Sequence, residues 1–241
     1  MKSSQKKYKK AYDRAEFYKD LFAHDMNNLL QNIRTSVELF QLWENSPEKR
    51  EDKKNLLEMI EDQIDRGVNL ISNVRKLSII DQEEVQLREV DLESVLVKSI
   101  NYITKRVSQK DINIKLSPIS SDFKVLGGDL LLDAFKNIIY NGIIHNEQDT
   151  KEVKIKVSKS QNENWIQIEF RDNGIGIEDK LKNLIFMRDD RKDKSKGGLG
   201  IGLSLVKKII NTYKGKIWVE NRVKEDHTQG SNFIILLKKY D

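Results

Sequence analysis

The first third of the chain carries its apolar residues at helical spacing. From about residue 8 to residue 40 they step by three, four or seven positions, as Ala11, Ala15, Tyr18, Phe22, Leu29, Ile33 and Phe40 do. Such steps place side chains in one stripe along a long α-helix. The stripe breaks at Asn45-Ser46-Pro47, where Ser46 suits an N-cap and Pro47 suits the first turn of a new helix.

A second helical stripe follows this break and ends near Ile80. Its members are Leu57, Ile60, Ile64, Ile71 and Val74. Two long amphipathic helices with a short connection predict an antiparallel hairpin. A single hairpin gives each stripe only one partner, whereas two hairpins in a four-helix bundle bury both stripes. The pattern therefore predicts a homodimer.

The rest of the chain mixes two periods. Helical spacing is expected at 92–107, 128–144 and 203–213, and strands are expected at 112–116, 151–158, 165–170, 216–220 and 232–237. The polar and acidic segment 81–90 is predicted to be a linker. The fold class is therefore α+β, with a helical hairpin domain at 1–83 and an α/β-sandwich domain at 84–241.

Composition narrows the setting of the protein. Charged residues make up 34% of the chain and the mean hydropathy is -0.62. No apolar run approaches the roughly 18 residues that span a bilayer, and the lysine-rich start is unlike a signal peptide. We therefore expect a cytoplasmic protein without membrane insertion. Zero Cys excludes disulfides, and the three scattered His residues argue against zinc.

The net charge of +5 is spread over the chain's start, the segment 188–196 and the last positions. This distribution is typical of a solvated surface with one basic loop that could serve phosphates. Nucleic acid is not expected as a partner.

The first candidate motif is Asp172-Asn173-Gly174-Ile175-Gly176-Ile177, which follows the predicted strand at 165–170. The Asp172 carboxylate can accept a hydrogen bond from the exocyclic amine of adenine. Gly174 and Gly176 would let the backbone close against a flat ring. A simple turn after a strand uses the same residues, so this motif alone leaves both interpretations open.

The second motif, at 197–203, is glycine-rich and opens a predicted helix. Such a turn offers backbone N–H groups and a positive dipole end to phosphates. It is not a P-loop, because no GxxxxGK[ST] occurs in the chain. A flexible hinge is the alternative.

The third motif places Asn137, Asn141 and, less closely, His145 on one helical face. An amide oxygen is a reasonable Mg²⁺ ligand when ATP phosphates supply most of the charge. Solvent-exposed or capping residues are the alternative for this motif alone.

The order of these motifs resembles the ATP-binding fold shared by histidine kinases, gyrase-type topoisomerases, mismatch-repair ATPases and one chaperone family. The resemblance covers about residues 91–240. It implies that Asn141 binds Mg²⁺, that Asp172 binds adenine and that 186–196 form an ATP lid. The ATP-binding residues predicted in this way are Asn137, Asn141, His145, Asp172, Gly174, Gly176, Ile177, Gly198, Leu199, Gly200, Ile201, Gly202 and Leu203.

The segment around His24 is similar to the phospho-acceptor box of histidine kinases, which has the form His-(Glu/Asp)-x-x-(Thr/Asn). Here the residues are His24, Asp25 and Asn28. His24 lies two residues, or about 200° of helix rotation, from Phe22, so it is predicted to face outward.

The two resemblances together predict a sensor histidine kinase of the two-component type. His24 would attack the γ-phosphorus of ATP, and Asp25 would orient the ring and accept the proton. The resemblance further implies phosphotransfer to an Asp of a response regulator. It also implies a phosphatase role in which Asn28 positions water.

The chain departs from the family at two positions. Leu29 stands where a proline usually follows the box, and Ile144 stands where a Lys often follows the Mg²⁺-binding Asn. Basic residues of the predicted lid could replace the missing charge.

Three other functions use some of the same motifs. They are a dimeric scaffold that binds ATP without transfer, an ATPase of the gyrase or mismatch-repair type, and a serine kinase of the anti-sigma type. The gyrase-type ATPases carry a catalytic acid on the Asn helix, whereas Asn137 is not a base. The anti-sigma kinases lack a His-bearing hairpin.

Overall fold

The computed structural model describes residues 2–82, 86–107, 111–120, 123–186 and 201–240. Within these ranges the side chains of 2–8, 10–21, 24, 81 and 82 are not described. The chain divides into two compact units, Met1–Ser78 and Ile79–Asp241.

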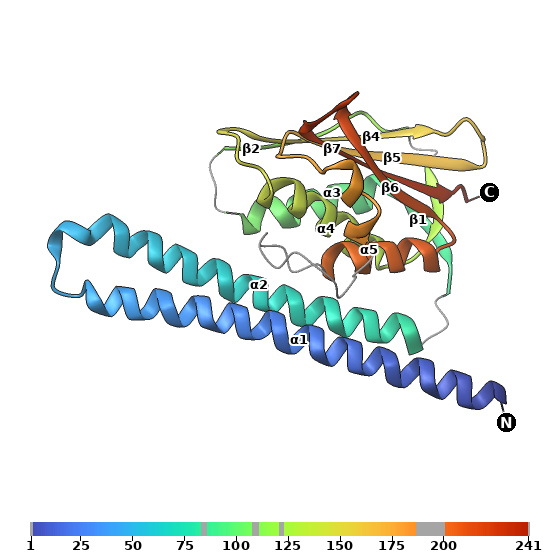
Figure 1. The fold of residues 1–241 in the computed structure, drawn as a ribbon. Helices are drawn as coiled ribbons and strands as arrows, with labels where there is room; N and C mark the ends of the chain where they lie inside the picture. The colour runs from blue at the N-terminus through green and yellow to red at the C-terminus, as the bar shows by residue number, and fades with distance from the viewer. Residues whose placement is uncertain (1, 83–85, 108–110, 121–122, 187–200, 241) are drawn as a thin grey trace. The chain divides into compact units, whose positions relative to one another are not determined.

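The first unit is the predicted antiparallel hairpin (Figure 1). Helix α1 (Lys2–Leu42) and helix α2 (Arg50–Gln82) are joined through a short 3-10 helix η1 (Pro47–Lys49). Ser46 is extended at the N-cap of η1, as expected, but its side chain makes no capping hydrogen bond.

Contacts between α1 and α2 set the register of the hairpin. Asn32 Nδ2 donates to Gln63 Oε1 at 3.3 Å. Nearer the end of α2, Gly67 lies against Leu29, whose Cδ1 is 3.6 Å from the point where a β-carbon would stand. The small residue thus allows the two helices to approach closely at this level.

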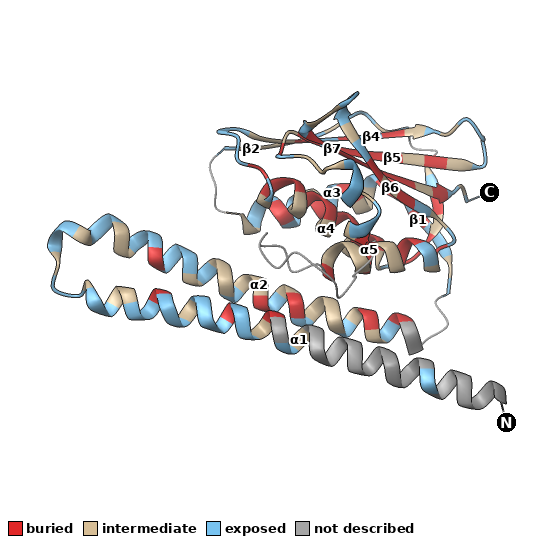
Figure 2. Cartoon of the chain, viewed as in Figure 1, coloured by how far each residue is buried: buried red, intermediate tan, exposed pale blue. Residues whose placement is uncertain are grey.

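The two apolar faces of the hairpin differ in burial (Figure 2). Leu29 of α1 and Leu56 and Leu70 of α2 are buried, and buried positions occur on both helices in the figure. On another face of α2, Leu57 is 49% exposed and Val68 is 53% exposed. The face that packs within the chain is therefore distinct from most of the stripe predicted for α2.

The second unit is an α/β sandwich, which confirms the predicted fold class (Figure 1). Its main sheet has the strand order β2-β4-β5-β7-β6, in which β2 and β4 are parallel and the other pairs are antiparallel. The strands are β2 (Ile112–Leu116), β4 (Lys151–Lys159), β5 (Trp165–Asp172), β6 (Lys216–Val223) and β7 (Asp226–Lys238). The helices α3 (Leu92–Arg106), α4 (Leu131–Ile144) and α5 (Ile201–Thr212) cover one face of this sheet.

Alternation along the strands builds the core. Val153, Ile155 and Val157 of β4 are buried, whereas the intervening Lys154 and Lys156 are exposed. Successive side chains of a strand point to opposite faces, so one face of the sheet meets the helices. Its opposite face carries the exposed Lys154 and Lys156; several of the sheet's exposed positions are visible as pale blue segments in Figure 2.

The predicted linker 81–90 is wrong at both ends. Helix α2 continues to Gln82, and a strand β1 (Arg88–Asp91) pairs antiparallel with β3 (Lys124–Gly127), which was not predicted. Val90 is the single buried residue of β1, so this strand lacks the alternation of apolar and polar residues that predicts a strand. Asp91 then caps α3 by accepting hydrogen bonds from the backbone N–H groups of residues 93 and 94.

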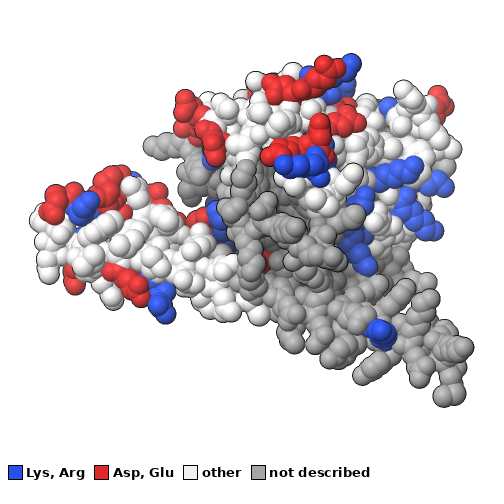
Figure 3. Space-filling view, in the orientation of Figure 1, with Lys and Arg blue, Asp and Glu red and all other residues white. Residues whose placement is uncertain are grey.

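Two short 3-10 helices, η2 (Asp179–Leu181) and η3 (Leu184–Phe186), follow the end of β5. None of the described helices combines the length and the hydrophobicity that crossing a membrane requires. On the face shown in Figure 3, acidic and basic side chains lie beside one another along the upper edge.

Candidate functional site

Asp172 ends the central strand β5 and is buried, with 7% of its surface exposed. Its Oδ1 accepts hydrogen bonds from the N–H groups of Gly174 at 2.9 Å and Ser231 at 3.1 Å. Burial raises the pKa of the Asp172 carboxyl above its usual value, although these two hydrogen bonds oppose the shift. Both of these hydrogen bonds end on Oδ1, and within the described residues no N–H group donates to Oδ2 in the same way, so Oδ2 can accept from a ligand.

Glycines let the backbone pack closely around Asp172. Gly176 and Gly230 have positive φ angles of 69° and 103°. A β-carbon on Gly176 would collide with the carbonyl oxygen of His227, and one on Gly230 would collide with the carbonyl oxygen of Asp172. Both positions therefore require glycine for conformational and steric reasons.

Helix α4 runs past this strand end and connects it with the start of α5. Gly142 lies beside Asp172, because a β-carbon there would be 3.1 Å from the Asp172 β-carbon. One to two turns earlier, Gly202 lies beside Asn137, whose Oδ1 would be 2.9 Å from a Gly202 β-carbon. Asn141 lies between these two contacts along the helix.

The end of α4 closes onto the loop after β5. His145 is the exposed C-cap residue, and its carbonyl oxygen accepts from the N–H of Ile175 at 3.2 Å. Asn146 is 2% exposed, and its Nδ2 donates to Asn173 Oδ1 at 2.7 Å. The same Asn173 oxygen accepts from the N–H of Glu152 at 2.6 Å. These hydrogen bonds join α4, β4 and the Asp172 loop.

The structure thus brings most of the predicted ATP-binding residues of the second unit to one region. Asn137, Asn141, His145, Asp172, Gly174, Gly176 and Gly202 lie along α4, at the end of β5 and at the start of α5. Ile177 follows the glycine loop, and Ile201 and Leu203 belong to the first turn of α5. Gly198, Leu199, Gly200 and residues 187–196 of the predicted lid lie outside the described residues.

The first residue of the predicted lid, Phe186, lies in the described part of the chain. Phe186 is buried and makes an edge-on contact with Phe233, with ring centroids 6.1 Å apart. Lys207 of α5 places its Nζ 5.5 Å from the centre of the Phe186 ring and donates to the carbonyl oxygen of Ile217 at 3.0 Å. This packing ties η3 to α5 and to the sheet.

The predicted phospho-acceptor box lies in the first unit, within α1. His24 is helical in backbone, and its side chain is outside the described part, so its predicted outward orientation stays a prediction. Asp25 is buried, with 7% exposure, and Asn28 is exposed one turn further along the helix.

Sequence reasoning missed the supporting residues of this site. Ser231 binds Asp172 from a strand that is 59 residues away in sequence, and no local pattern announces that contact. Asn173 belongs to the first motif and Asn146 directly follows His145, but the supporting role of both residues depends on hydrogen bonds that only the structure shows.

The chain matches the sequence models of two protein families. Residues 20–83 match the His Kinase A (phospho-acceptor) domain. Residues 128–241 match the histidine kinase-, DNA gyrase B-, and HSP90-like ATPase.

Curated relatives are similar over most of the chain. The sensor protein kinase WalK of Staphylococcus saprophyticus is 28% identical over 218 residues, which is 87% of this chain and 34% of that protein. Cyanobacterial phytochrome A of Nostoc sp. is 26% identical over 209 residues, which is 86% of this chain and 26% of that protein. The chain therefore spans about a quarter to a third of the length of these relatives.

A solved structure shares the fold over almost the whole chain. The histidine kinase ThkA, in complex with the response regulator protein TrrA, gives a TM-score of 0.67 at 19% identity. The match covers 98% of this chain and 66% of that one.

Proposed function

Because this chain belongs to the histidine kinases, with a phospho-acceptor domain followed by an ATPase domain, we propose that it transfers the γ-phosphoryl group of ATP to His24. The observation that carries this proposal is the convergence of Asn137, Asp172 and Gly202 along α4. In this arrangement Asp172 would bind adenine near one end of α4, and the start of α5 at Gly202 would bind phosphates near the other.

The nucleotide would lie along α4. Asp172 Oδ2 would accept from the adenine amine, and Oδ1 stays held by Gly174 and Ser231. At the other end, the first N–H groups of α5 have no partner within their own helix, so they are suited to phosphate oxygens. The nucleotide would span the helix from its base to its phosphates.

Asn141 is the proposed Mg²⁺ ligand. It lies between the Asp172 and Gly202 contacts and offers a neutral carboxamide oxygen. The described residues hold no group of three or more His, Asp or Glu side chains that could cage a metal. This fits Mg²⁺, which usually takes one or two protein ligands and fills its other positions with phosphates and water. When bound, the ion would neutralise charge on the phosphates.

Transfer to His24 would form a phosphorus–nitrogen bond and break the bond between the γ-phosphorus and the bridging oxygen, which leaves with ADP. The attacking imidazole nitrogen must be unprotonated, as it is for much of a histidine population at neutral pH. Asp25 would orient the ring and take the proton from the other nitrogen. Asn28, exposed one turn later, would position water when a phosphorylated regulator is dephosphorylated.

The partner in phosphotransfer would be a response regulator with an acceptor Asp. Support comes from ThkA, whose solved structure is a complex with the response regulator protein TrrA. The second partner would be another copy of this chain, because the exposed apolar face of α2 has no cover within the hairpin.

A gyrase-type ATPase is less well supported by the Asn helix. Asp133 is the acid on α4, and Lys136 Nζ holds it in an ion pair at 2.8 Å. Position 137 is an amide whose Nδ2 donates to the carbonyl oxygen of Asp133 at 2.8 Å. Neither group is arranged as a general base for water.

The test is incubation with γ-labelled ATP and Mg²⁺, with wild type beside His24→Gln. We expect acid-labile, base-stable label on wild type and none on the variant, while both bind ATP equally. Binding without label in wild type would favour the scaffold function instead. Label that persists in the variant would place the acceptor elsewhere.

A further inference from the structure

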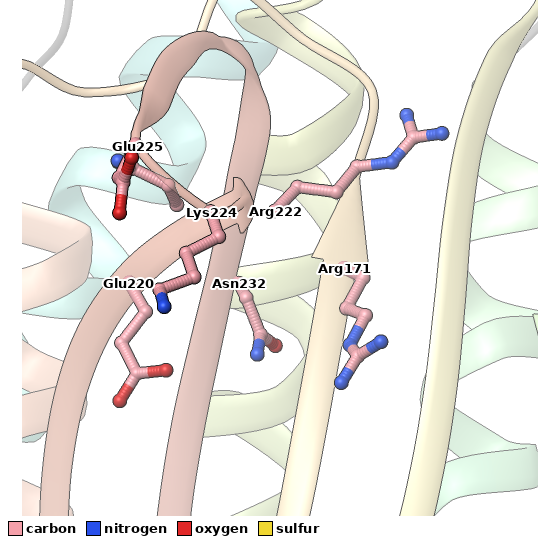
Figure 4. Close-up of a pocket in the computed structure, with 7 residues that line it drawn as sticks. Arg171, Glu220, Arg222, Lys224, Glu225 and Asn232 are labelled. Atoms are coloured by element: carbon pink, nitrogen blue, oxygen red, sulfur yellow. The ribbon is translucent and has the colours of Figure 1, made fainter.

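The open face of the main sheet holds a cavity of about 340 Å³ at the ends of β5, β6 and β7 (Figure 4). Its lining includes three basic side chains, Arg171, Arg222 and Lys224, and two acidic ones, Glu220 and Glu225. Ligand cavities in proteins begin at about 300 Å³, so this cavity suits a small ligand.

The cavity and Asp172 lie on opposite faces of the main sheet. Arg171 precedes Asp172 in β5, and Asn232 follows Ser231 in β7. Arg171 and Asn232 are register partners, and adjacent strand residues point to opposite faces. Asp172 and Ser231 therefore lie on the side of the proposed nucleotide site, and Arg171 and Asn232 line the cavity on the opposite side of the sheet.

A buried carboxylate lies beneath the cavity. Glu169 is 6% exposed and accepts from Arg171 Nε at 2.9 Å and from Gln167 Nε2 at 3.1 Å. Burial alone would raise the pKa of Glu169, but the hydrogen bonds and charge of Arg171, with Gln167 and Asn232, hold it below the usual value. Glu169 is therefore ionised at neutral pH.

This carboxylate fixes the orientation of Asn232. Asn232 is 6% exposed and directs Nδ2 to Glu169 Oε2 at 3.3 Å. An ionised carboxylate only accepts hydrogen bonds, so the amide must present its NH₂ group to Glu169. Its Oδ1 is then left buried and without a hydrogen-bond donor within the described structure. Buried acceptors without a partner are uncommon and costly.

The rim of the cavity offers charges of both signs. Arg222 and Lys224 are exposed, and neither makes an ion pair within 4.0 Å among the described residues. Glu220 accepts from Trp218 Nε1 at 2.7 Å and, like Glu225, is one of the residues that line the cavity. A dianion such as phosphate would be repelled by the carboxylates of Glu220 and Glu225. A zwitterionic ligand could pair its negative group with a basic side chain and its positive group with a carboxylate.

We propose that this cavity binds a small zwitterion of the amino-acid class. The ligand's carboxylate pairs with Arg222 and Lys224, and its ammonium group donates to Asn232 Oδ1 and Glu220. Figure 4 shows Asn232 between Glu220 and Arg171, with Lys224 on the Glu220 side.

Occupancy of the cavity is expected to change nucleotide affinity, and this part rests on the proposed function. Asn232 and Ser231 are consecutive, and the Ser231 N–H holds Asp172 at 3.1 Å. A ligand that draws Asn232 toward the open face acts on the same backbone. By linkage, the nucleotide must then change the affinity for the zwitterion by the same factor.

The first experiment is calorimetric titration of the full chain without nucleotide, so its outcome is independent of kinase activity. The probes are glycine and L-glutamate, with N-acetylglycine lacking the ammonium group, glycinamide lacking the carboxylate, and inorganic phosphate as the dianion. We expect an amino acid to bind with a Kd below about 10 mM and the blocked analogues to bind at least about tenfold more weakly.

The variants are Arg222→Gln with Lys224→Gln, beside Lys159→Gln, which removes one positive charge from the exposed end of β4 and is the charge-matched control for Lys224→Gln alone. The double variant should weaken amino-acid binding at least about tenfold, and Lys159→Gln should leave it unchanged. Circular dichroism checks that each variant folds. If the double variant does not fold, Lys224→Gln alone is used in its place. Absence of binding, equal binding by all variants, or tighter binding of phosphate would each overturn the proposal.

The second experiment measures the Kd of a non-hydrolysable ATP analogue with and without the saturating amino acid. We expect a change of several-fold. An unchanged Kd would overturn the coupling, and a protein that binds no analogue in either condition would instead contradict the proposed function.

Discussion

The hairpin and the sandwich bury their apolar residues to different extents. In the second unit, Leu92, Phe135 and Ile155 are each 0% exposed, because helices and sheet enclose them from all sides. In the first unit, Leu57 is 49% exposed and Val68 is 53% exposed, although both lie in the middle of a regular helix.

This difference indicates that the two units complete their cores by different means. A sheet covered by three helices can close its own core, whereas two helices in contact bury only one face each. The second face of the hairpin is left exposed within one chain, and we expect a symmetric copy of the hairpin to cover it. An interaction between copies would place two phospho-acceptor helices in one bundle.

The largest expected effect breaks this partnership. Leu57→Glu, Ile64→Glu and Val68→Glu together place three charges on the exposed face of α2, where a partner helix would have to desolvate them. Light scattering should show the wild type at twice the 28.2 kDa mass of one chain and the variant at that mass.

The control for this variant is Asn55→Glu, which adds a charge to α2 at an exposed position outside the apolar face. It should remain dimeric. Nucleotide binding, as a property of the second unit, should survive in all variants. A triple variant that stays dimeric would show that the hairpin completes its core in another way.

A smaller effect tests whether the buried carboxylate of Asp172 serves ligand binding at the expense of folding stability. Asp172→Asn keeps an oxygen for the Gly174 and Ser231 N–H groups but replaces Oδ2 with a donor, which in the proposed binding mode would face the adenine amine, itself a donor. Loss of a hydrogen bond to a charged group costs about 1.5–3 kcal/mol, so ATP should bind at least about tenfold more weakly in equilibrium titration.

The same substitution should stabilise the fold at neutral pH. The folded pKa of Asp172 is raised from 3.8, so folding favours the protonated form. The stability it contributes is complete below about pH 4 and is lost as the pH rises through the folded pKa. The gain of Asp172→Asn in denaturant unfolding should therefore be near zero at low pH and grow as the pH rises. A gain that shrinks with pH would contradict the burial argument.

The sequence predicted the helices and strands of both units well, because their apolar periods are long and regular. Helix α3 was expected at 92–107 and spans Leu92–Arg106, and β2 was predicted with its observed bounds. The pair β1 and β3 was missed, since four-residue strands with one or two buried positions carry too little pattern. Their pairing depends on a contact between Val90 and Val125 that only the folded chain reveals.

The site divides in a similar way. Asp172, Asn141 and Gly202 could be singled out because glycine turns and amides at helical spacing suit a nucleotide. The residues that hold these groups in place could not be predicted. Ser231 and Asn146 act through hydrogen bonds whose geometry depends on β7 and on the end of α4. Local sequence thus indicates groups that could touch the ligand, and tertiary structure indicates those that position them.

The smallest expected effect tests how completely the sandwich satisfies its buried polar groups. Tyr213 is 1% exposed, and its hydroxyl oxygen accepts from the N–H of Leu130 at 3.2 Å, at the start of α4. Burial raises the pKa of Tyr213 to about 12, so the hydroxyl stays protonated at neutral pH. Tyr213→Phe would leave the partly buried Leu130 N–H without this acceptor, which costs about 1 kcal/mol.

Denaturant unfolding should show that loss as a lower midpoint with an unchanged slope. The matched control is Tyr240→Phe, because Tyr240 is 39% exposed and water can replace its hydroxyl. Equal stability of both variants would mean that α4 satisfies its first N–H groups without Tyr213. A loss confined to Tyr213→Phe would show that the closed unit depends on buried hydrogen bonds as well as on apolar packing. The half-open hairpin has many of its polar groups in water, so equivalent hydroxyl removals there should cost less.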